Sequence, residues 1–331
     1  MATIKDVARK AGVSVCTASR VLSNKGYLKE ATKEKVLEAV KELGYVQNRT
    51  ATELKTGVSD TIAILLPDIE NPFYSHFANV IEKYAYAKGY LLFICSTAYD
   101  LEKEEKFLRS MSARNIRGVI AVPLTADISN YRKYLGNVPL VIFNRDIPDN
   151  EALCYKVDIK HVAFEVTSHL IDIGRRNIGC IFQSFEIGNF KKRYEGARES
   201  ILKANIEFRE ENMIFDAGGP DTESKLRKLF SRKDRPDAIF ASNDMLAFMV
   251  YKVLNELGLS IPSDVAVASI DDTLMADQIY PTLTSYSFPI EEIARLIIDG
   301  FAYKQHEYTN KILKGQLEKR MSTAVDHKQK V

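Results

Sequence analysis

The sequence predicts a small all-α N-terminal head followed by an α/β core of two doubly wound lobes with parallel sheets. Residues 1–46 carry apolar side chains at helical spacing between glycine stops. From residue 61, apolar runs alternate with amphipathic stretches, as they do in parallel sheets covered by helices. This alternation occurs in two successive series, and 331 residues, 46% of them hydrophobic, suffice for two or three domains.

The first two helices of the head are predicted from their capping residues. Thr3 and Asp6 have the spacing of a capping box, so a helix should begin there and end at Gly12. Ser14 can cap a second short helix that ends near Leu22. Its inward residues would be Ala18, Val21 and Leu22, and its outer face would carry Val15, Cys16, Ser19 and Arg20.

A third amphipathic helix is expected at about 32–43, before Gly44. Its apolar residues are Val36, Leu37, Val40 and Leu43. Two short helices around a tight turn, together with a third, form the helix-turn-helix unit that places one helix in the DNA major groove. A plain three-helix bundle, the alternative, has no need for a slim second helix with an outward arginine, so the pattern favours a DNA-binding head.

The core should contain strands and helices in alternation, with ligand-accepting loops at the carboxyl ends of the strands. The predicted strands are 61–66, 90–95, 118–122, 139–143, 177–182, 237–241 and 265–270. The predicted helices are 73–88, 101–114, 129–135, 160–173, 189–204, 222–230 and 243–257.

Charge and cysteine content limit the class of protein. Residues 1–60 hold 11 Lys and Arg against 7 Asp and Glu, whereas the remainder holds 35 against 37, so the positive surplus lies in the predicted DNA-binding part. The four cysteines form no Cys-x-x-Cys pair, which argues against a zinc site or a disulfide framework and is typical of a reducing cytosol. No leader and no apolar run of roughly 18 residues is present, so we expect a cytoplasmic protein with no membrane partner.

An enzyme is the first competing class, because α/β lobes also serve dehydrogenases and hydrolases. The sequence lacks the glycine-rich nucleotide motifs and the Gly-x-Ser-x-Gly motif, and its five histidines are scattered without metal-ligand spacing. We therefore expect no catalytic residues, no metal and no cofactor. A sugar-binding transport protein would explain the lobes, but it would need a secretory leader where this chain has the predicted head.

Several separated stretches resemble the lactose-repressor/galactose-repressor (LacI/GalR) family of bacterial transcription regulators. They occur in the family's order at 4–14, 19–22, 66–74, 240–244, 270–272, 281–284 and 317–322. The resemblance implies a hinge-bending pair of lobes like that of type I periplasmic binding proteins, with strands crossing between the lobes. The implied domains are the head at 1–46, a hinge helix and linker at 47–60, an N-terminal lobe at 61–159 with about 285–318, and a C-terminal lobe at 160–284 with about 319–331.

The same resemblance implies roles in DNA binding. Val15, Cys16 and Arg20 occupy the positions that read bases; an arginine suits guanine and a valine suits the thymine methyl group, whereas a thiol is a poor donor. Phosphate contacts are expected from small polar residues, namely Thr3, Ser14, Thr17, Ser19 and Asn24. The minor-groove hinge helix would use Asn48, Ala51, Leu54 and Lys55, with Leu54 as the wedge between base steps. An ordinary linker is the alternative in the free protein, because so short a helix is marginal in water.

The resemblance also implies an effector site in the cleft between the lobes. The implied residues are Phe73, Tyr74, Asn144, Arg145, Arg193, Asn243 and Asp271. Ile159 stands where the family commonly has asparagine and Asn144 where aspartate is common, so a phosphorylated sugar or another small metabolite remains open beside a neutral hexose.

The predicted function is therefore that of a sequence-specific transcriptional regulator, most simply a repressor, controlled by a sugar-like effector. A homodimer would bind a pseudopalindromic operator, because two-fold symmetry places recognition helices about one DNA turn apart. Induction and corepression both fit the sequence. An alternative control is a phosphorylated protein corepressor that docks on the N-terminal lobe.

Overall fold

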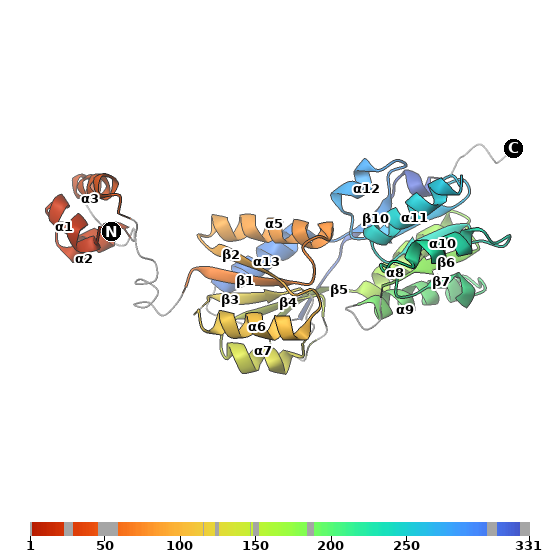
Figure 1. Ribbon diagram of the computed structural model, residues 1–331, viewed down its shortest axis with the longest axis horizontal. Helices are drawn as coiled ribbons and strands as arrows, with labels where there is room; N and C mark the ends of the chain where they lie inside the picture. Colours follow the sequence, from red (N-terminus) through yellow and green to blue (C-terminus); the bar gives the residue numbers. More distant parts are fainter. Residues whose placement is uncertain are drawn as a thin grey trace. The chain divides into compact units, whose positions relative to one another are not determined.

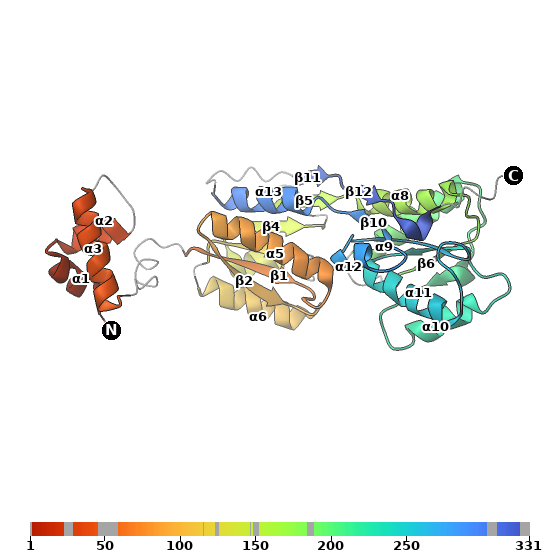
Figure 2. The same ribbon diagram turned by 90° about the horizontal axis from the view of Figure 1, so that it is seen from above.

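The computed structural model describes residues 2–22, 29–45, 59–114, 116–122, 126–145, 147, 152–183, 189–302 and 310–324. The chain divides into two compact units, Met1–Val58 and Ser59–Val331. The first unit is the predicted helical head and the second is the predicted two-lobed core (Figures 1 and 2).

The head consists of α1 (Ile4–Ala11), α2 (Val15–Leu22) and α3 (Glu30–Leu43). The predicted capping box of α1 is present, because the Thr3 hydroxyl accepts from the Asp6 amide and the Asp6 carboxylate accepts from the Thr3 amide at 3.0 Å. Gly12 ends α1 in the left-handed conformation, with a φ of 64°. The Ser14 hydroxyl accepts from the Thr17 amide at 3.1 Å and so caps α2 as expected.

A small apolar core holds these three helices together. The inward face of α2 contributes Ala18 and Val21, and Leu22 packs against the same cluster, as the spacing predicts. Leu37 differs from the expectation: 48% of it is exposed, and the helix buries Val36 and Ala39 instead. The physical reason is the 3.6-residue period, which places position 39 on the face of position 36 and turns position 37 outward.

The described residues of the core form two six-stranded sheets, in the orders β11-β5-β4-β3-β1-β2 and β12-β10-β9-β8-β6-β7. Strand pairs are parallel except β10 with β12. The first sheet uses β1 (Thr61–Leu66), β2 (Leu91–Ser96), β3 (Gly118–Ala121), β4 (Leu140–Phe143), β5 (Leu153–Val157) and β11 (Asn310–Leu313). The second uses β6 (Ile178–Ile181), β7 (Met213–Ile214), β8 (Ala238–Ala241), β9 (Ala266–Ile270), β10 (Thr284–Ser287) and β12 (Gln316–Glu318).

Helices cover both faces of each sheet, which is the doubly wound arrangement (Figure 1). We call each sheet with its helices a lobe. In the first lobe, one face carries α5 (Pro72–Ala87) and α13 (Ile290–Ala302), and the other carries α6 (Leu101–Ser112) and α7 (Ile128–Leu135). In the second lobe, α8 (Ile159–Asp172) and α9 (Phe190–Lys203) pack together, α10 (Thr222–Phe230) packs with α11 (Asp244–Glu256), and the short α12 (Leu274–Gln278) follows β9.

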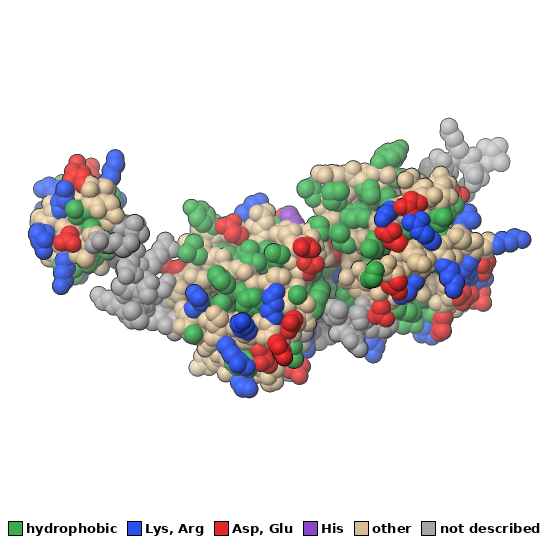
Figure 3. All heavy atoms as spheres, viewed as in Figure 1, with side chains coloured by type: hydrophobic (Ala, Val, Ile, Leu, Met, Phe, Trp, Pro, Cys, Tyr) green, Lys and Arg blue, Asp and Glu red, His purple; other side chains and the backbone are tan. Residues whose placement is uncertain are grey.

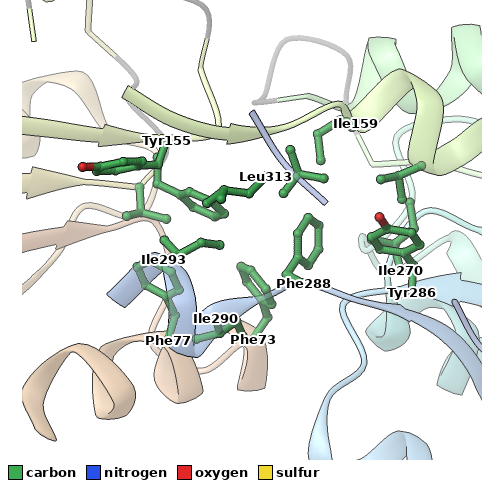
Figure 4. Close-up of a cluster of buried hydrophobic side chains, with 14 of the residues drawn as sticks. Phe73, Phe77, Tyr155, Ile159, Ile270, Tyr286, Phe288, Ile290, Ile293 and Leu313 are labelled. Atoms are coloured by element: carbon green, nitrogen blue, oxygen red, sulfur yellow. The ribbon is translucent and has the colours of Figure 1, made fainter. Parts of the chain in front are cut away.

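The chain passes between the lobes three times: from β5 to α8, from β10 to α13, and from β11 to β12. Figure 4 shows Phe288, on the second crossing, between Phe73 of the first lobe and Tyr286 of the second. Its ring centroid lies 5.3 Å from that of Phe73 and 5.9 Å from that of Tyr286. A continuous apolar cluster therefore runs through the crossing region.

Five strands of the described residues lie outside the predicted strand ranges, namely β5, β7, β10, β11 and β12. Each has only two to five residues, so its apolar run is too short to stand out. Residues 284–287 (β10) and 316–318 (β12) pair in the second sheet. The predicted first-lobe segment at about 285–318 therefore includes, at each end, a strand that belongs to the second lobe.

Candidate functional site: a recognition helix and an interlobe pocket

The outer face of α2 presents the residues predicted to read bases. Cys16 and Arg20 are exposed, and 43% of Val15 is exposed. Ala18 and Val21 hold the opposite face in the head core. An apolar side chain, a thiol and a guanidinium therefore share one surface of a slim helix, which suits contact with base edges.

The small polar residues of the head serve first to form the helix starts. Thr3 and Ser14 are exposed caps of α1 and α2, and the Ser14 and Thr17 hydroxyls lie 2.8 Å apart. Ser19 is half-buried on α2. Asn24 and the hinge residues Asn48, Ala51, Leu54 and Lys55 lie outside the described residues, so their predicted roles remain predictions.

A pocket of about 540 Å³, its open mouth included, lies between the two lobes of the core. The first lobe lines it with Asn71, Phe73, Tyr74, Tyr99, Phe143 and Asn144. The second lobe lines it with Gln183, Asn189, Phe190, Arg193, Asn243 and Asp271. We call this the interlobe pocket; Phe288 of the β10–α13 crossing also borders it.

A buried cation and a buried carboxyl face each other in the interlobe pocket. Arg193, on the first turn of α9, places Nη2 3.7 Å from Oδ1 of Asp271, which follows β9. The Arg193 side chain also donates from Nη1 to the carbonyl oxygen of Ser242, and its Nε has no hydrogen-bond partner among the described residues. An effector oxygen could accept from Nε and lie against the Phe190 ring, whose centroid is 5.2 Å from the guanidinium carbon.

Burial changes the protonation of the Asp271 carboxyl. It raises the pKa of Asp271 to about 8, against the opposing effect of Arg193, and the nearby Asp244 charge raises it further. Asp244 is itself fully buried, and burial raises its pKa, although four donors hold its carboxylate oxygens. The donors are the hydroxyls of Ser269 at 2.5 Å and Ser285 at 2.6 Å, and the amide and hydroxyl of Thr273 at 2.7 and 2.8 Å.

Aromatic rings form the first-lobe side of the interlobe pocket. The Phe73 and Tyr74 rings follow the Asn71 cap of α5, whose side-chain oxygen accepts from the Phe73 amide at 3.0 Å. The Tyr74 hydroxyl lies 3.4 Å from that of Tyr99, and burial raises the pKa of Tyr74 well above its ordinary value. These hydroxyls therefore remain neutral, and the rings offer flat apolar surface with polar tips.

Amide side chains supply the remaining polar groups. Asn144 follows β4 in the left-handed conformation, with a φ of 60°, and its Oδ1 accepts from the Val157 amide at 3.0 Å. Asn243 caps α11 through Oδ1 and donates from Nδ2 to Gln183 at 3.1 Å. Asn189 donates from Nδ2 to the Asn144 carbonyl oxygen at 2.6 Å, which joins the two lobes at the pocket wall.

Six of the seven residues predicted for the effector site line this pocket, and Arg145 does not. Arg145 donates from Nη1 to the carbonyl oxygen of Ala126 at 2.9 Å and lines a neighbouring cavity instead. This hydrogen bond turns the Arg145 guanidinium away from the interlobe pocket, whereas Asn144 lines both cavities. Several lining residues follow the carboxyl ends of strands, where ligands bind in such sheets, and yet were not predicted. The lining residues absent from the prediction are Asn71, Tyr99, Val122, Phe143, Gln183, Asn189, Phe190 and Phe288.

Two further observations concern what the described parts of the chain contain. No helix among them is both long and apolar enough to cross a membrane. No group of three or more His, Cys, Asp and Glu side chains in those parts is placed to hold a metal ion.

A helix-turn-helix unit joined to a two-lobed core with a polar interlobe pocket defines the class of ligand-responsive DNA-binding regulators. Residues 3–48 match the lacI family of bacterial regulatory proteins, and residues 167–302 match the periplasmic binding protein-like domain.

Relatives match over nearly the whole chain. The transcriptional repressor PurR of Vibrio vulnificus is 31% identical over 93% of this chain and 94% of its own length. The ribose operon repressor of Halalkalibacterium halodurans is 33% identical over 88% of this chain and 87% of its own length. A solved complex of the transcriptional regulator CelR with cellobiose covers 97% of this chain and 100% of that one, at 27% identity and a TM-score of 0.70. The chain belongs to the lacI family of bacterial transcriptional regulators.

Proposed function

We propose that this protein is a homodimeric, cytoplasmic repressor whose affinity for a pseudopalindromic operator is controlled by a neutral, sugar-like effector in the interlobe pocket. The observation that carries the effector class is the pocket lining. Aromatic rings, amide groups and the Arg193–Asp271 pair surround one space, and the Asp271 carboxyl keeps its proton up to about pH 8. Such a lining suits a ligand with a flat apolar face and many hydroxyls.

The DNA-binding end of the proposal uses the outer face of α2. Val15, Cys16 and Arg20 would read bases, and Thr3, Ser14, Thr17, Ser19 and Asn24 would hold the register on phosphates. Residues 47–60 would form the hinge and linker, with Asn48, Ala51, Leu54 and Lys55 in the minor groove. Each lobe is one sheet with its helices, and the effector would bind between the two lobes.

The proposed dimer needs an apolar surface outside the pocket. Leu91, Phe93 and Ile94 are about half exposed on β2, the edge strand of the first sheet. In the second lobe, 75% of Leu274 and 80% of Tyr280 are exposed in and after α12. Figure 3 shows hydrophobic side chains gathered over α12 and around α5 and β2. Burial of these side chains against a second copy would stabilise the dimer.

The interlobe pocket provides a physical link between effector and DNA. Its walls belong to both lobes, so a bound ligand favours the lobe arrangement in which both walls contact it. A coupling of this kind is typically ~1–3 kcal/mol per ligand, or about 5–150-fold in operator affinity. Repression with induction and repression with corepression differ only in the sign of this coupling.

The effector proposal is tested by calorimetric titration of the full-length protein. The panel would contain neutral pentoses, hexoses and disaccharides, with nucleobases and amino acids as contrasting classes. We expect saturable binding of at least one neutral sugar and its loss in Asp271→Ala. Binding confined to a contrasting class, or sugar binding unaffected by Asp271→Ala, would overturn the assignment of a sugar to this pocket.

A further inference from the structure

One buried carboxylate of the second lobe does not line the interlobe pocket, although the residue before it does. Asp244 is the first residue of α11 and is fully buried, and its neighbour Asn243 lines the pocket. A buried charge is costly unless hydrogen bonds hold it, so a carboxylate at this position needs a physical explanation.

Four hydrogen bonds hold the Asp244 carboxylate. Oδ1 accepts from the hydroxyls of Ser269 and Ser285 at 2.5 and 2.6 Å. Oδ2 accepts from the amide and the hydroxyl of Thr273 at 2.7 and 2.8 Å. All four groups donate to Asp244, which is the pattern that an ionised carboxylate requires.

These hydrogen bonds end on a turn with an unusual backbone. Asp271 and Asp272, which follow β9, have φ angles of 118° and 47°, in the left-handed region that residues other than glycine rarely adopt. Asp271 is the residue whose carboxyl faces Arg193 in the interlobe pocket. A strained conformation of this kind persists only where surrounding contacts hold it.

Asp244 supplies much of the support for this turn. The Asp272 amide donates to the Ser285 hydroxyl at 2.9 Å, and that hydroxyl donates in turn to Asp244. The Thr273 amide donates to Asp244 directly. The Asp271 amide is held by a carbonyl oxygen of β10 at 3.0 Å. Two of the three consecutive amides of the turn therefore depend on Asp244.

The side chain of Thr273 is also used to hold the turn. Thr273 stands at the N-cap position of α12, where a threonine usually accepts from an amide of the first turn. Its hydroxyl makes no such bond to the described residues of α12 and donates to Asp244 instead. The local cap is thus given up for a contact with the buried carboxylate.

Asp244 also acts on Asp271 through its charge. Among the described residues, the charged and titratable groups that act on Asp271 are Arg193 of α9, Asp244 of α11, Tyr74 of α5 and Tyr99, which follows β2. Burial raises the pKa of Asp271 to about 8, Arg193 opposes the rise, and the charge of Asp244 adds to it. Asp244 therefore favours the protonated Asp271 carboxyl, which can donate a hydrogen bond as well as accept one.

We propose that Asp244 is a positioning residue for effector binding, which holds the turn that carries Asp271 without contacting the effector itself. It fixes the direction of the Asp271 carboxyl relative to Arg193, and it keeps that carboxyl able to donate to a ligand oxygen. The role in effector binding rests on the proposed function, whereas the control of Asp271 does not.

The first test needs no ligand. Infrared spectra of the full-length protein at a series of pH values follow the carbonyl stretch of the protonated Asp271 carboxyl, which is identified by its absence in Asp271→Asn. In the wild type this band should disappear with a midpoint at about pH 8. In Asp244→Asn the midpoint should fall by about one unit or more, because a neighbouring negative charge is removed and the turn is loosened.

Asp237→Asn is the matched control. Asp237 precedes β8, whereas Asp244 follows it, and the Asp237 carboxylate also accepts from main-chain amides, those of Arg176 and Asn177 at 3.1 Å. The substitution thus removes a structural carboxylate of the same lobe without touching the turn. Its midpoint should equal that of the wild type, and melting temperatures check that both variants fold.

Thr273→Val is a milder variant that carries the same test if Asp244→Asn does not fold. It removes one donor to Asp244 and nearly keeps the shape of the side chain. The midpoint should fall in the same direction but by less. Thr273→Ser is its control, because serine keeps the hydroxyl, and it should titrate like the wild type.

The second test measures effector binding by calorimetric titration with the panel of neutral pentoses, hexoses and disaccharides. For each sugar that binds the wild type, the affinity should fall at least about tenfold in Asp244→Asn, since a hydrogen bond from Asp271 to the ligand is misaligned. In Asp237→Asn it should change by no more than about twofold, because Asp237 has no partner at the turn.

Three results would overturn the positioning role. They are an unchanged midpoint in Asp244→Asn, a sugar that this variant binds as tightly as the wild type does, and equal effects of Asp244→Asn and Asp237→Asn. The last would show a general loss of packing in the second lobe. If the midpoint falls as expected and no neutral sugar binds the wild type, the proposed effector class fails while the control of Asp271 by Asp244 stands.

Discussion

The Arg193 guanidinium and the Asp271 carboxyl lie 3.7 Å apart in the lining of the interlobe pocket, and both side chains are largely buried. Burial raises the pKa of Asp271 to about 8 even though Arg193 opposes the rise. The pair therefore changes its net charge close to neutral pH, and its oxygen and nitrogen atoms face the space that a ligand would fill.

The first prediction concerns stability and pH in Asp271→Asn. The folded protein keeps the Asp271 proton up to about pH 8, whereas an unfolded aspartate loses it near pH ~4. The contribution of Asp271 to stability is thus present below pH ~4 and is lost progressively as the pH rises to about 8. Asparagine does not ionise, so Asp271→Asn should not lose this contribution. Its unfolding free energy should therefore rise relative to that of the wild type as the pH increases from 5 to 8.

Urea denaturation at several pH values measures this difference. Asp277→Asn is a suitable control, because the Asp277 side chain is largely exposed. A difference between Asp271→Asn and wild type that stays constant across this pH range would show that Asp271 has an ordinary pKa in the folded protein.

The second prediction separates effector binding from DNA binding. Arg193→Met should weaken effector binding by about tenfold or more, because the fork of donors that faces the pocket is lost. Operator binding without effector should stay within about twofold, since Arg193 lies in the core and not in the head. Fluorescence anisotropy on operator DNA, with and without effector, reports both quantities.

Arg198→Met is the matched control for Arg193→Met. Arg198 is exposed on the same helix, where its guanidinium lies 5.5 Å from the Phe208 ring centroid, outside the interlobe pocket. This variant should retain the effector response. Equal loss of the response in the two variants would mean that α9 acts through its fold rather than through Arg193.

The third prediction concerns the recognition helix. Arg20→Ala should weaken operator binding by ~1–3 kcal/mol, because a guanidinium forms a bidentate contact with guanine. Affinity for unrelated DNA should fall much less. Arg9→Ala is the control: the Arg9 side chain is 80% exposed on α1 and pairs with Asp6 at 3.3 Å. If both variants lose affinity for operator and unrelated DNA alike, Arg20 contacts phosphate and not a base.

The fourth prediction tests the packing of α8 on α9. A Cβ at Gly196 would overlap the carbonyl oxygen of Lys160, so Gly196→Ala must push the two helices apart. We expect a loss of about 1–3 kcal/mol in unfolding free energy, the usual cost of overpacking. Gly219→Ala is the control, because its nearest atom, Oδ1 of Asp221, would be 3.5 Å from the new Cβ. Comparable stability of the two variants in urea would contradict this close packing.

The sequence predicted the regular elements well where local signals are strong. The Thr3–Asp6 capping box, the Ser14 cap and the long buried strands all appear as expected. Short strands such as β11 and β12 escaped prediction because their few residues are paired by tertiary contacts, not by their own pattern.

The candidate pocket was predicted only in part, for a related reason. Asn144 was expected from the family resemblance, but its hydrogen bond with Asn189 joins residues 45 positions apart and depends on how the lobes meet. Arg145 stands next to Asn144 in sequence, yet its guanidinium donates to the carbonyl oxygen of Ala126 and lines the neighbouring cavity, not the interlobe pocket. The set of side chains that line the pocket thus depends on how the two lobes meet at the crossings. No local sequence pattern predicts that arrangement.

The central claim is that one chain reads DNA with its head and senses a small molecule with its core. Selection of random duplex DNA by the full-length protein tests it most directly, at roughly 0.1–0.15 M salt to suppress nonspecific phosphate binding. The selection would be run without ligand and with a panel of sugars and sugar phosphates. We predict a pseudopalindromic site with a pyrimidine–purine step at its centre, whose enrichment changes with one ligand class. No enriched sequence under any of these conditions would contradict the account.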